Sequence, residues 1–394
     1  MILLTVAVAL VAGLLLLPLI ADAGALVVSA TRATSKRPED MDSMPRLLFL
    51  IPAHDEEALI GACVSSLVAL NYPAHKQEVV VVADNCSDAT AAMARIAGAR
   101  VLERSDEAQP GKPRALDWAL GQLPLDEFDA VLIIDADTVV DSNMAEALAE
   151  NAPLNEKGVQ AYCAVDNPGE SALTKMAAVL AASRYEFHFP LKDRAGLNVP
   201  LLGNGMCIGT EILKRHGWRA FSICEDWELY ALITTDGYRI EGNPDARVFA
   251  QEARSIREGD SQRQRWAAGK LTVLGKQWPE LLRSRRITGL QKLDALAELT
   301  HLGPAVHLGL VVLLTGIVYG VQPPGALWLL VGLWASVLRI GLYTLCGLTR
   351  MQRPWKTGMA FLYLPFYTVW RLVVQVRSLR LIGGGPWIKT RRNR

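Results

Sequence analysis

Each of three short apolar runs in this sequence is followed by acidic residues. Leu47–Ile51 precedes Asp55 and Glu57, Val79–Val82 precedes Asp84, and Val131–Ile134 precedes Asp135 and Asp137. Helix capping explains single Asp, Asn or Ser residues at such points. It explains Asp135 and Asp137 less well, because two carboxylates spaced two apart on an emerging strand point the same way and repel each other unless a cation lies between them. Mg²⁺ and Mn²⁺ prefer such oxygen ligands, so this pair predicts a divalent-cation site.

Two later motifs also carry candidate site residues. Glu225 and Asp226 form a carboxylate pair just before a predicted helix, and Gln262-Arg263-Gln264-Arg265-Trp266 lies on a polar helix after a basic stretch. Taken alone, a solvated helix face with one buried tryptophan explains the second motif equally well.

The elements that must position these residues alternate between strands and helices. Short β-prone runs are separated by the helical stretches Glu56–Leu70, Asp88–Ala97 and Lys112–Leu120. Such alternation predicts an α/β domain at residues 45–277, with a mixed, mostly parallel sheet covered by helices on both faces. Ligands of such sheets bind at the carboxyl ends of the strands, where the acidic residues lie.

Charge and hydropathy divide the rest of the chain. Eleven of the 41 Lys/Arg residues follow Glu298, the last acidic residue, so the net charge of +1 combines −10 before residue 299 with +11 after it. The all-basic end is also strongly apolar, which indicates a membrane and not nucleic acid. The six cysteines are scattered without paired spacing, which argues against a disulfide framework or a structural zinc site and fits a reducing compartment.

The N-terminal residues 1–31 are apolar except for Asp22, and the run Ile2–Ile20 is long enough to cross a bilayer. We predict a transmembrane helix; a cleaved signal peptide is the alternative, weakened by the absence of Lys or Arg before the run. Arg32, Lys36 and Arg37 follow the run, which predicts that the chain enters the cytoplasm there.

The C-terminal third divides into three predicted segments. Residues 278–302 form an amphipathic interfacial segment, and residues 303–348, whose only formal charge is Arg339, form a two-helix transmembrane hairpin. Residues 357–394 contain Arg371, Arg377 and Arg380 within an apolar run and end in a basic tail. We predict that this run lies in the cytoplasmic interface, with spanning as the alternative.

Taken together, the motifs resemble the membrane-bound family-2 glycosyltransferases with a GT-A fold, which include cellulose, hyaluronan and chitin-oligosaccharide synthases and ceramide glucosyltransferases. The resemblance rests on five matches in order: Asp55, Asp84, Asp135 with Asp137, Glu225-Asp226, and Gln262, Arg265 and Trp266 as a QxxRW element. It covers residues 45–277 and, through the spans, most of the chain.

The resemblance implies roles for these residues in binding a UDP-sugar donor. Asp55 and Glu57 line the nucleotide pocket, Asp84 accepts the uracil N–H, and Lys112 lies near the uridine or its phosphates. Asp135 orients the ribose or the metal shell, and Asp137 ligates the Mg²⁺ or Mn²⁺ that bridges the diphosphate. Arg265 pairs with the diphosphate.

It also implies how the sugar is transferred. Asp226, next to Glu225, is the general base for the acceptor hydroxyl, and in-line displacement inverts the anomeric configuration. Trp266 stacks on the acceptor sugar, with Gln262 and Trp227 also assigned to the acceptor. Gly203-Asn204-Gly205 matches a loop near the donor, or is a plain turn. Trp387–Arg391 matches a basic C-terminal loop, which a basic membrane-surface tail explains equally well.

We therefore expect a multi-pass protein of the inner or plasma membrane with a cytoplasmic catalytic domain, in cell-surface polysaccharide synthesis. Its acceptor is saccharide or lipid-linked, and a homo-oligomer or an export partner is expected if the product is a polymer, because few helices follow the catalytic domain. The alternatives are a glycolipid synthase acting on ceramide or diacylglycerol and, remotely, an inactive scaffold or nucleotide sensor. An inactive scaffold or nucleotide sensor would lack some of the acidic residues of the motifs, and all of them are present.

Overall fold

The computed structural model describes residues 2–31 and 44–382. They form two compact units, each assembled from segments that are distant in sequence. The sheet unit contains the described residues of 33–167 and 198–252, and the helical unit contains those of 1–32, 168–197 and 253–394.

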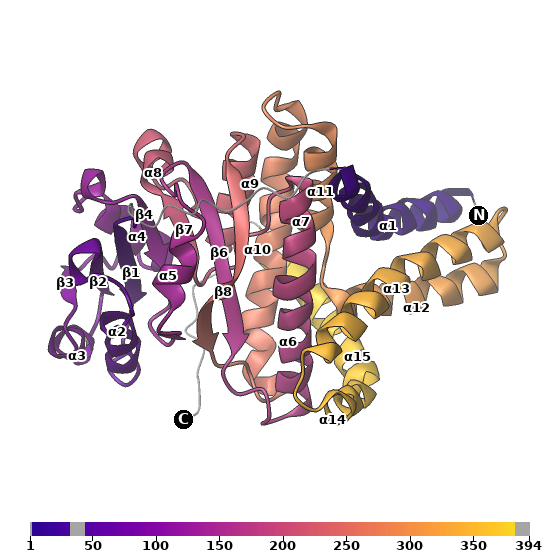
Figure 1. Ribbon diagram of the computed structural model, residues 1–394. Coiled ribbons are helices and arrows are strands. Elements are labelled where there is room, and N and C mark those ends of the chain that lie inside the picture. Colours follow the sequence, from indigo (N-terminus) through magenta and orange to yellow (C-terminus); the bar gives the residue numbers. More distant parts are fainter. Residues whose placement is uncertain (1, 32–43, 383–394) are drawn as a thin grey trace. The chain divides into compact units, whose positions relative to one another are not determined.

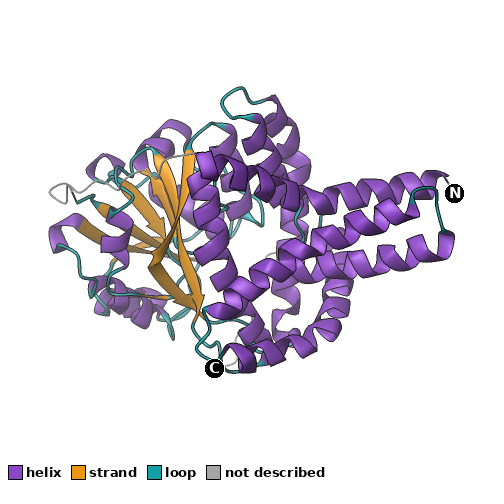
Figure 2. Cartoon of the chain, turned by 45° about the vertical axis from the view of Figure 1, so that its right-hand side comes forward, coloured by secondary structure: helices purple, strands orange, loops and turns teal. Residues whose placement is uncertain are grey.

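The strands all belong to the sheet unit (Figures 1 and 2). Their bounds are β1 (Leu47–Ala53), β2 (Gln77–Asp84), β3 (Arg100–Arg104), β4 (Ala130–Ile133), β5 (Val139–Val140), β6 (Lys157–Val165), β7 (Met206–Gly209) and β8 (Arg239–Ala250). In the described residues they form one eight-stranded sheet in the order β3-β2-β1-β4-β7-β6-β8-β5. Strands β3, β2, β1 and β4 pair in parallel, as do β6 and β8, and the pairs β4–β7, β7–β6 and β8–β5 are antiparallel. The predicted mixed α/β sheet is confirmed.

The helices are shared between the two units. Those of the sheet unit are α2 (Ile60–Val68), α3 (Thr90–Ile96), α4 (Lys112–Leu120), α5 (Met144–Ala149), α8 (Thr210–His216) and α9 (Glu225–Thr235). Those of the helical unit are α1 (Ile2–Thr31), α6 (Ala172–Ser183), α7 (Phe189–Ala195), α10 (Ile256–Arg283), α11 (Gly289–Thr300), α12 (Pro304–Val321), α13 (Ala326–Thr349), α14 (Pro354–Gly358) and α15 (Leu364–Ser378).

The core of the sheet unit surrounds β1, whose residues Leu47–Ile51 are fully buried. Alternate residues of a strand face opposite sides of the sheet, so a strand buried throughout needs cover on both faces. Leu47, Phe49 and Ile51 share one hydrophobic cluster with residues of α2, α3 and α5. Helix α4 also packs against β1 and β2.

In the helical unit, α1, α12 and α13 lie side by side (Figure 2). Val8, Val311 and Leu333 belong to one apolar cluster that joins the three helices. In the described residues, four helical segments are long and apolar enough to cross a membrane: Leu3–Thr31, Pro304–Val321, Ala326–Thr349 and Pro354–Leu381. By length and composition, these four segments are candidate membrane spans.

The segment at residues 278–302 is not one continuous helix. Helix α10 passes through the predicted boundary at residue 277 and ends at Arg283, and α11 begins after Thr288. Thr288 and Gln291 form a capping box, in which each side chain satisfies the other's backbone N–H. This cap explains why a new helix starts there.

A buried ion pair joins the first and third of the four apolar segments. Asp22 of α1 accepts a 2.7 Å hydrogen bond from Nε of Arg339 of α13, and both side chains are largely buried. His188 Nε2 lies 3.3 Å from the Asp22 carboxylate. Charged side chains within apolar helices are costly unless they are paired, and here each charge has an opposite partner.

Lys192 of α7 is completely buried between two carboxylates of α11. Its Nζ lies 2.8 Å from Asp294 and 3.0 Å from Glu298. Lys192→Met keeps the apolar stem but leaves two buried carboxylates without their cation, so we expect the free energy of unfolding to fall by about 3 kcal/mol. Thermal unfolding of the detergent-solubilised protein measures this as a lower Tm. Lys276→Met, at an exposed position of α10, is the matched control; equal Tm values for the two variants would contradict the prediction.

Candidate functional site

The acidic residues after β1, β2 and β4 lie at one edge of the sheet. These three strands are neighbours and run parallel, so their carboxyl ends lie together. Asp84 is the last residue of β2, and Asp55 and Asp135 follow β1 and β4 by two residues. The sequence predicted this edge as the ligand-binding side of the sheet.

Lys112 lies at the centre of a cluster at this edge. Its Nζ donates hydrogen bonds to Asp135 Oδ1 at 2.7 Å and to the carbonyl oxygen of Gly203 at 2.6 Å. Glu225 Oε1 is 3.3 Å away. Burial alone would lower the pKa of Lys112, but the Asp135 and Glu225 carboxylates outweigh it and hold that pKa above its usual value. The lysine is therefore a permanent cation among oxygen ligands.

Asp226 lies in the first turn of α9, beside this cluster. Its Oδ1 accepts a 2.8 Å hydrogen bond from the backbone N–H of Trp227. Burial, with the neighbouring Glu225 carboxylate, raises the pKa of Asp226 to about 7. A carboxyl group with that pKa is suited to accept a proton near neutral pH. Glu228 has a different task, because its Oε2 accepts from the backbone N–H of Ser222 and holds the start of α9 in place.

A loop of small residues runs directly past Asp226. Gly203 has a φ of +81°, and a Cβ atom there would lie 3.3 Å from Asp226 Oδ2. Asn204 ties this loop to the turn after β4, since its Oδ1 accepts from Asp135 N at 3.2 Å and its Nδ2 donates to Thr138 Oγ1 at 2.8 Å. These two hydrogen bonds fix the loop against the Asp135–Thr138 turn. Asp137, in that same turn, is half-buried.

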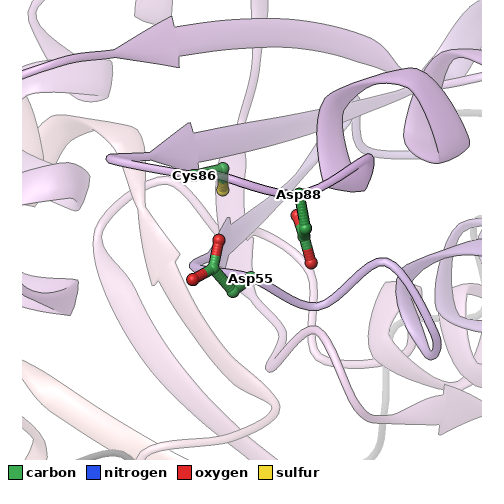
Figure 3. A group of neighbouring side chains, drawn as sticks. All are labelled: Asp55, Cys86 and Asp88. Carbon is green, nitrogen blue, oxygen red and sulfur yellow. The ribbon is translucent and has the colours of Figure 1, made fainter.

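Asp55, Cys86 and Asp88 form a compact group at the ends of β1 and β2 (Figure 3). Their oxygen and sulfur atoms lie within 4.8 Å of one another, close enough to hold a metal ion. Hydrogen bonds also explain the arrangement: Asp88 accepts from Thr90 N at 2.9 Å at the start of α3 and from Glu57 N at 3.1 Å. Burial raises the pKa of the Cys86 thiol, which disfavours the thiolate that binds metals.

Glu57 and Asp55 join the loop after β1 to the loop after β2. Glu57 Oε2 accepts from Ala89 N at 3.0 Å, and Asp55 Oδ1 accepts from Ser87 N at 2.7 Å. Asp55 has a φ of +51°, an uncommon value that these contacts stabilise. Asp55 and Glu57 therefore shape the rim of the site edge.

Arg104 also lies at this edge of the sheet, and the sequence did not indicate it. It lies at the end of β3, opposite Asp84 in the parallel register, and its Nη1 donates a 2.6 Å hydrogen bond to Asp84 Oδ1. Both side chains are 6% exposed. The signal that could have located it is the strand β3 itself, which was not recognised.

The QxxRW residues lie on α10, in the helical unit. Gln262, Arg265 and Trp266 share this helix, as predicted, and Trp266 is 44% exposed. The Arg263 guanidinium stacks over the Trp266 ring at 4.9 Å. Trp227, by contrast, lies in the sheet unit on α9, where its ring forms a T-shaped pair with the ring of Tyr230. The predicted C-terminal loop Trp387–Arg391 lies outside the described residues.

The family model described as "Glycosyltransferase like family 2" matches residues 45–269, more than half of the chain. A beta-monoglucosyldiacylglycerol synthase of Trichormus variabilis is 30% identical over 272 residues, covering 66% of this chain and 56% of the relative. A poly-beta-1,6-N-acetyl-D-glucosamine synthase of Staphylococcus aureus is 25% identical over 262 residues, covering 64% and 61%. The chain thus spans a little more than half of the length of these relatives.

One solved structure is similar over nearly the whole chain. It is the mannosyltransferase PcManGT from Pyrobaculum calidifontis in complex with GDP-Man and Mn²⁺, with a TM-score of 0.59, 21% sequence identity and coverage of 96% of this chain and 99% of that chain. This likeness shows that the two chains share a fold, the α/β GT-A fold.

Proposed function

Because the chain belongs to the family-2 glycosyltransferases, we propose that it transfers a hexose or N-acetylhexosamine from a UDP-sugar to an acceptor hydroxyl at the membrane, with inversion. One observation carries this proposal. Lys112, Asp135, Glu225 and Asp226 converge at the carboxyl edge of the sheet, where a cation, an anion-binding lysine and a base are all needed.

The nucleotide end of the donor lies along the strand ends. Asp55 and Glu57 form the rim of its pocket, and Asp84 accepts the uracil N–H. Lys112 offsets the negative charge of the diphosphate, which is the task of a point charge that stays protonated. Arg265 is proposed to pair with the diphosphate as a second cation.

Asp135 and Asp137 would hold Mg²⁺ or Mn²⁺. Their carboxylates are hard oxygen ligands two residues apart, and the position beside Asp135 already accommodates one cation, the Lys112 ammonium, 2.7 Å from Oδ1. The Asp135 side chain is 40% exposed, so it can reach a ligand from solvent. When bound, the ion stabilises the negative charge that develops on the leaving diphosphate.

Asp226 is the general base. Its carboxylate removes the proton from the acceptor hydroxyl while that oxygen attacks the anomeric carbon from the face opposite the diphosphate, so an α-linked donor gives a β-linkage. Glu225 assists by raising the basicity of Asp226 and by holding Lys112. The absence of a side chain at Gly203 leaves room for Asp226 Oδ2, which a Cβ atom there would approach to 3.3 Å.

The rate should follow the protonation of Asp226. With a pKa of about 7, this group is protonated and inactive at lower pH, so kcat/KM should rise through pH 7 and fall about tenfold per unit of pH below it. UDP release measured from pH 5.5 to 8.5 at low donor concentration tests this, with direct UDP binding over the same range as the control. A flat profile below pH 7 would contradict the role of Asp226.

The acceptor is proposed to be a saccharide, contacted by Trp266, Gln262 and Trp227. Aromatic rings suit the C–H face of a sugar, and the exposure of Trp266 leaves its ring accessible. The relative that makes poly-beta-1,6-N-acetyl-D-glucosamine supports a saccharide acceptor and the synthesis of cell-surface polysaccharide.

A glycolipid synthase is the second candidate, supported by the beta-monoglucosyldiacylglycerol synthase at 30% identity. Purified protein with radiolabelled UDP-sugars distinguishes the two acceptors. Label that enters a water-soluble or precipitable saccharide supports the first proposal. Label that enters the organic phase only when diacylglycerol or ceramide is supplied supports the second.

We place the sheet unit in the cytoplasm, with α1, α12 and α13 as three spans of the inner or plasma membrane. We propose that the fourth apolar segment, Pro354–Leu381, lies in the cytoplasmic interface. Trp370 Nε1 on this segment donates a 3.0 Å hydrogen bond to Asp260 of the polar helix α10, which favours an interfacial over a spanning position. A homo-oligomer or an export partner would be needed if the product is a polymer.

A further inference from the structure

The two carboxylate oxygens of Asp84 accept unequal numbers of hydrogen bonds from the protein. Oδ1 accepts from Arg104 Nη1 at 2.6 Å and from Asn85 Nδ2 at 3.1 Å. Oδ2 accepts from Gly111 N at 3.3 Å, a long bond. A carboxylate oxygen has two lone pairs, so Oδ1 is fully used within the protein and Oδ2 retains capacity for a ligand.

Arg104 is itself fixed by three contacts. Besides Asp84, its Nη2 donates to Asp106 Oδ2 at 2.8 Å and to the carbonyl oxygen of Gln109 at 2.9 Å. The planar guanidinium makes this geometry rigid. If Arg104 moved away from Asp84 Oδ1, it would also lose its hydrogen bonds to Asp106 and Gln109 in the loop that precedes Gly111.

The oxygen that remains faces the start of α4. Gly111 precedes Lys112, the first residue of that helix, and a Cβ atom at Gly111 would meet nothing within 4 Å. A nucleobase on Asp84 Oδ2 would thus lie beside Gly111, one residue from the lysine proposed to bind its diphosphate. The proposed contacts to the base and to the diphosphate therefore lie next to each other.

Nucleobases differ in how many donors they present to a carboxylate. Uracil presents a single N–H, at N3, between two carbonyl oxygens. Guanine presents its N1–H and its amino group side by side, a pair that matches both oxygens of a free carboxylate. Cytosine presents an acceptor at N3, which a carboxylate repels. A carboxylate with one oxygen already occupied therefore suits uracil and leaves one guanine donor without a partner.

We propose that Arg104 determines donor specificity: by occupying Asp84 Oδ1, it restricts the base-binding carboxylate to one acceptor and so selects uridine over guanosine diphosphate sugars. This inference rests on the proposed function. The similar fold of PcManGT, in complex with GDP-Man, shows that the fold by itself does not decide the base.

The test is equilibrium binding of UDP and GDP, each with Mn²⁺, to the full-length protein in detergent. Wild type should bind UDP more tightly than GDP. Arg104→Met frees Oδ1, so the ratio of the two dissociation constants should shrink by roughly tenfold. Arg104→Lys keeps a donor to Oδ1 and should largely preserve the ratio. Arg100→Met, at an exposed position on the same strand that pairs with Glu78, is the control and should leave it unchanged.

The outcomes separate this inference from the proposed function. An unchanged ratio in Arg104→Met, with both affinities lowered alike, would mean that Arg104 is only structural and would overturn the inference. Should Arg104→Met not fold, the wild-type protein still decides, because equal affinity for UDP and GDP contradicts the inference. Binding of neither nucleotide would refute the proposed function and this inference with it.

Discussion

Asp226→Asn should lower the rate of sugar transfer by roughly 10³-fold while leaving donor binding nearly intact. The amide keeps the size of the side chain and can still accept from Trp227 N, but it cannot take a proton from the acceptor hydroxyl. The loss should therefore appear in kcat, with little change in the donor KM.

The measurement is steady-state UDP release together with direct binding of UDP. Asp126→Asn is the matched control, because Asp126 is an exposed residue of the same unit whose side chain pairs with Lys214. Turnover in Asp226→Asn within a few-fold of wild type would exclude this residue as the base. A large loss of UDP affinity would instead assign Asp226 to the donor.

Asp137→Asn should abolish the cation dependence of donor binding and, with it, most activity, on the order of 10²-fold or more. The amide cannot supply the negative charge that Mg²⁺ or Mn²⁺ requires from its ligand. Calorimetric titration of UDP with and without Mn²⁺ tests this, since the wild type should bind UDP more tightly with the metal and the variant should not respond.

Asp141→Asn is the control for this experiment, because Asp141 lies four residues further on and its Oδ1 accepts from Asn143 N in a local turn. A variant at Asp137 that keeps the full response to Mn²⁺ would remove that residue from the metal site. A chelator that leaves wild-type turnover unchanged would contradict the metal requirement as a whole.

The strands that the sequence revealed are the buried central ones. β1, β2 and β4 are nearly continuous apolar runs because both of their faces are covered, and the sequence pattern located them within a few residues. β3 was missed because it is an edge strand, and its three charged residues among five hide the pattern. β8 was missed because Gly242, Asn243 and Pro244 interrupt it at a register shift.

The same difference explains which site residues were found. Asp55 and Asp135 follow recognised strands and Asp84 ends one, so their position at one edge could be predicted. Arg104 is the last residue of β3, one of the strands that were missed. The Gly203-Asn204-Gly205 loop was noted from its small residues, but residue type does not indicate that the backbone carbonyl oxygen of Gly203 accepts a hydrogen bond from Lys112.

The division into two units also lay beyond the sequence pattern. Residues 168–197 fall inside the predicted catalytic domain, yet they pack with α1, α11 and α13 in the helical unit. The reason is long-range pairing: Lys192 is held by Asp294 and Glu298, about a hundred residues later in the chain. Local composition does not reveal such long-range contacts, so it does not predict this division of the chain.

The most direct test of the account is UDP release by the purified, detergent-solubilised protein across a panel of UDP-sugars, with Mn²⁺ or Mg²⁺ present. We predict cation-dependent release from at least one UDP-hexose or UDP-N-acetylhexosamine, stimulated by an acceptor and lost in Asp226→Asn. Release from none of the panel, or release that is undiminished in Asp226→Asn, would contradict the proposal that this edge of the sheet is the active site of a UDP-sugar-dependent glycosyltransferase.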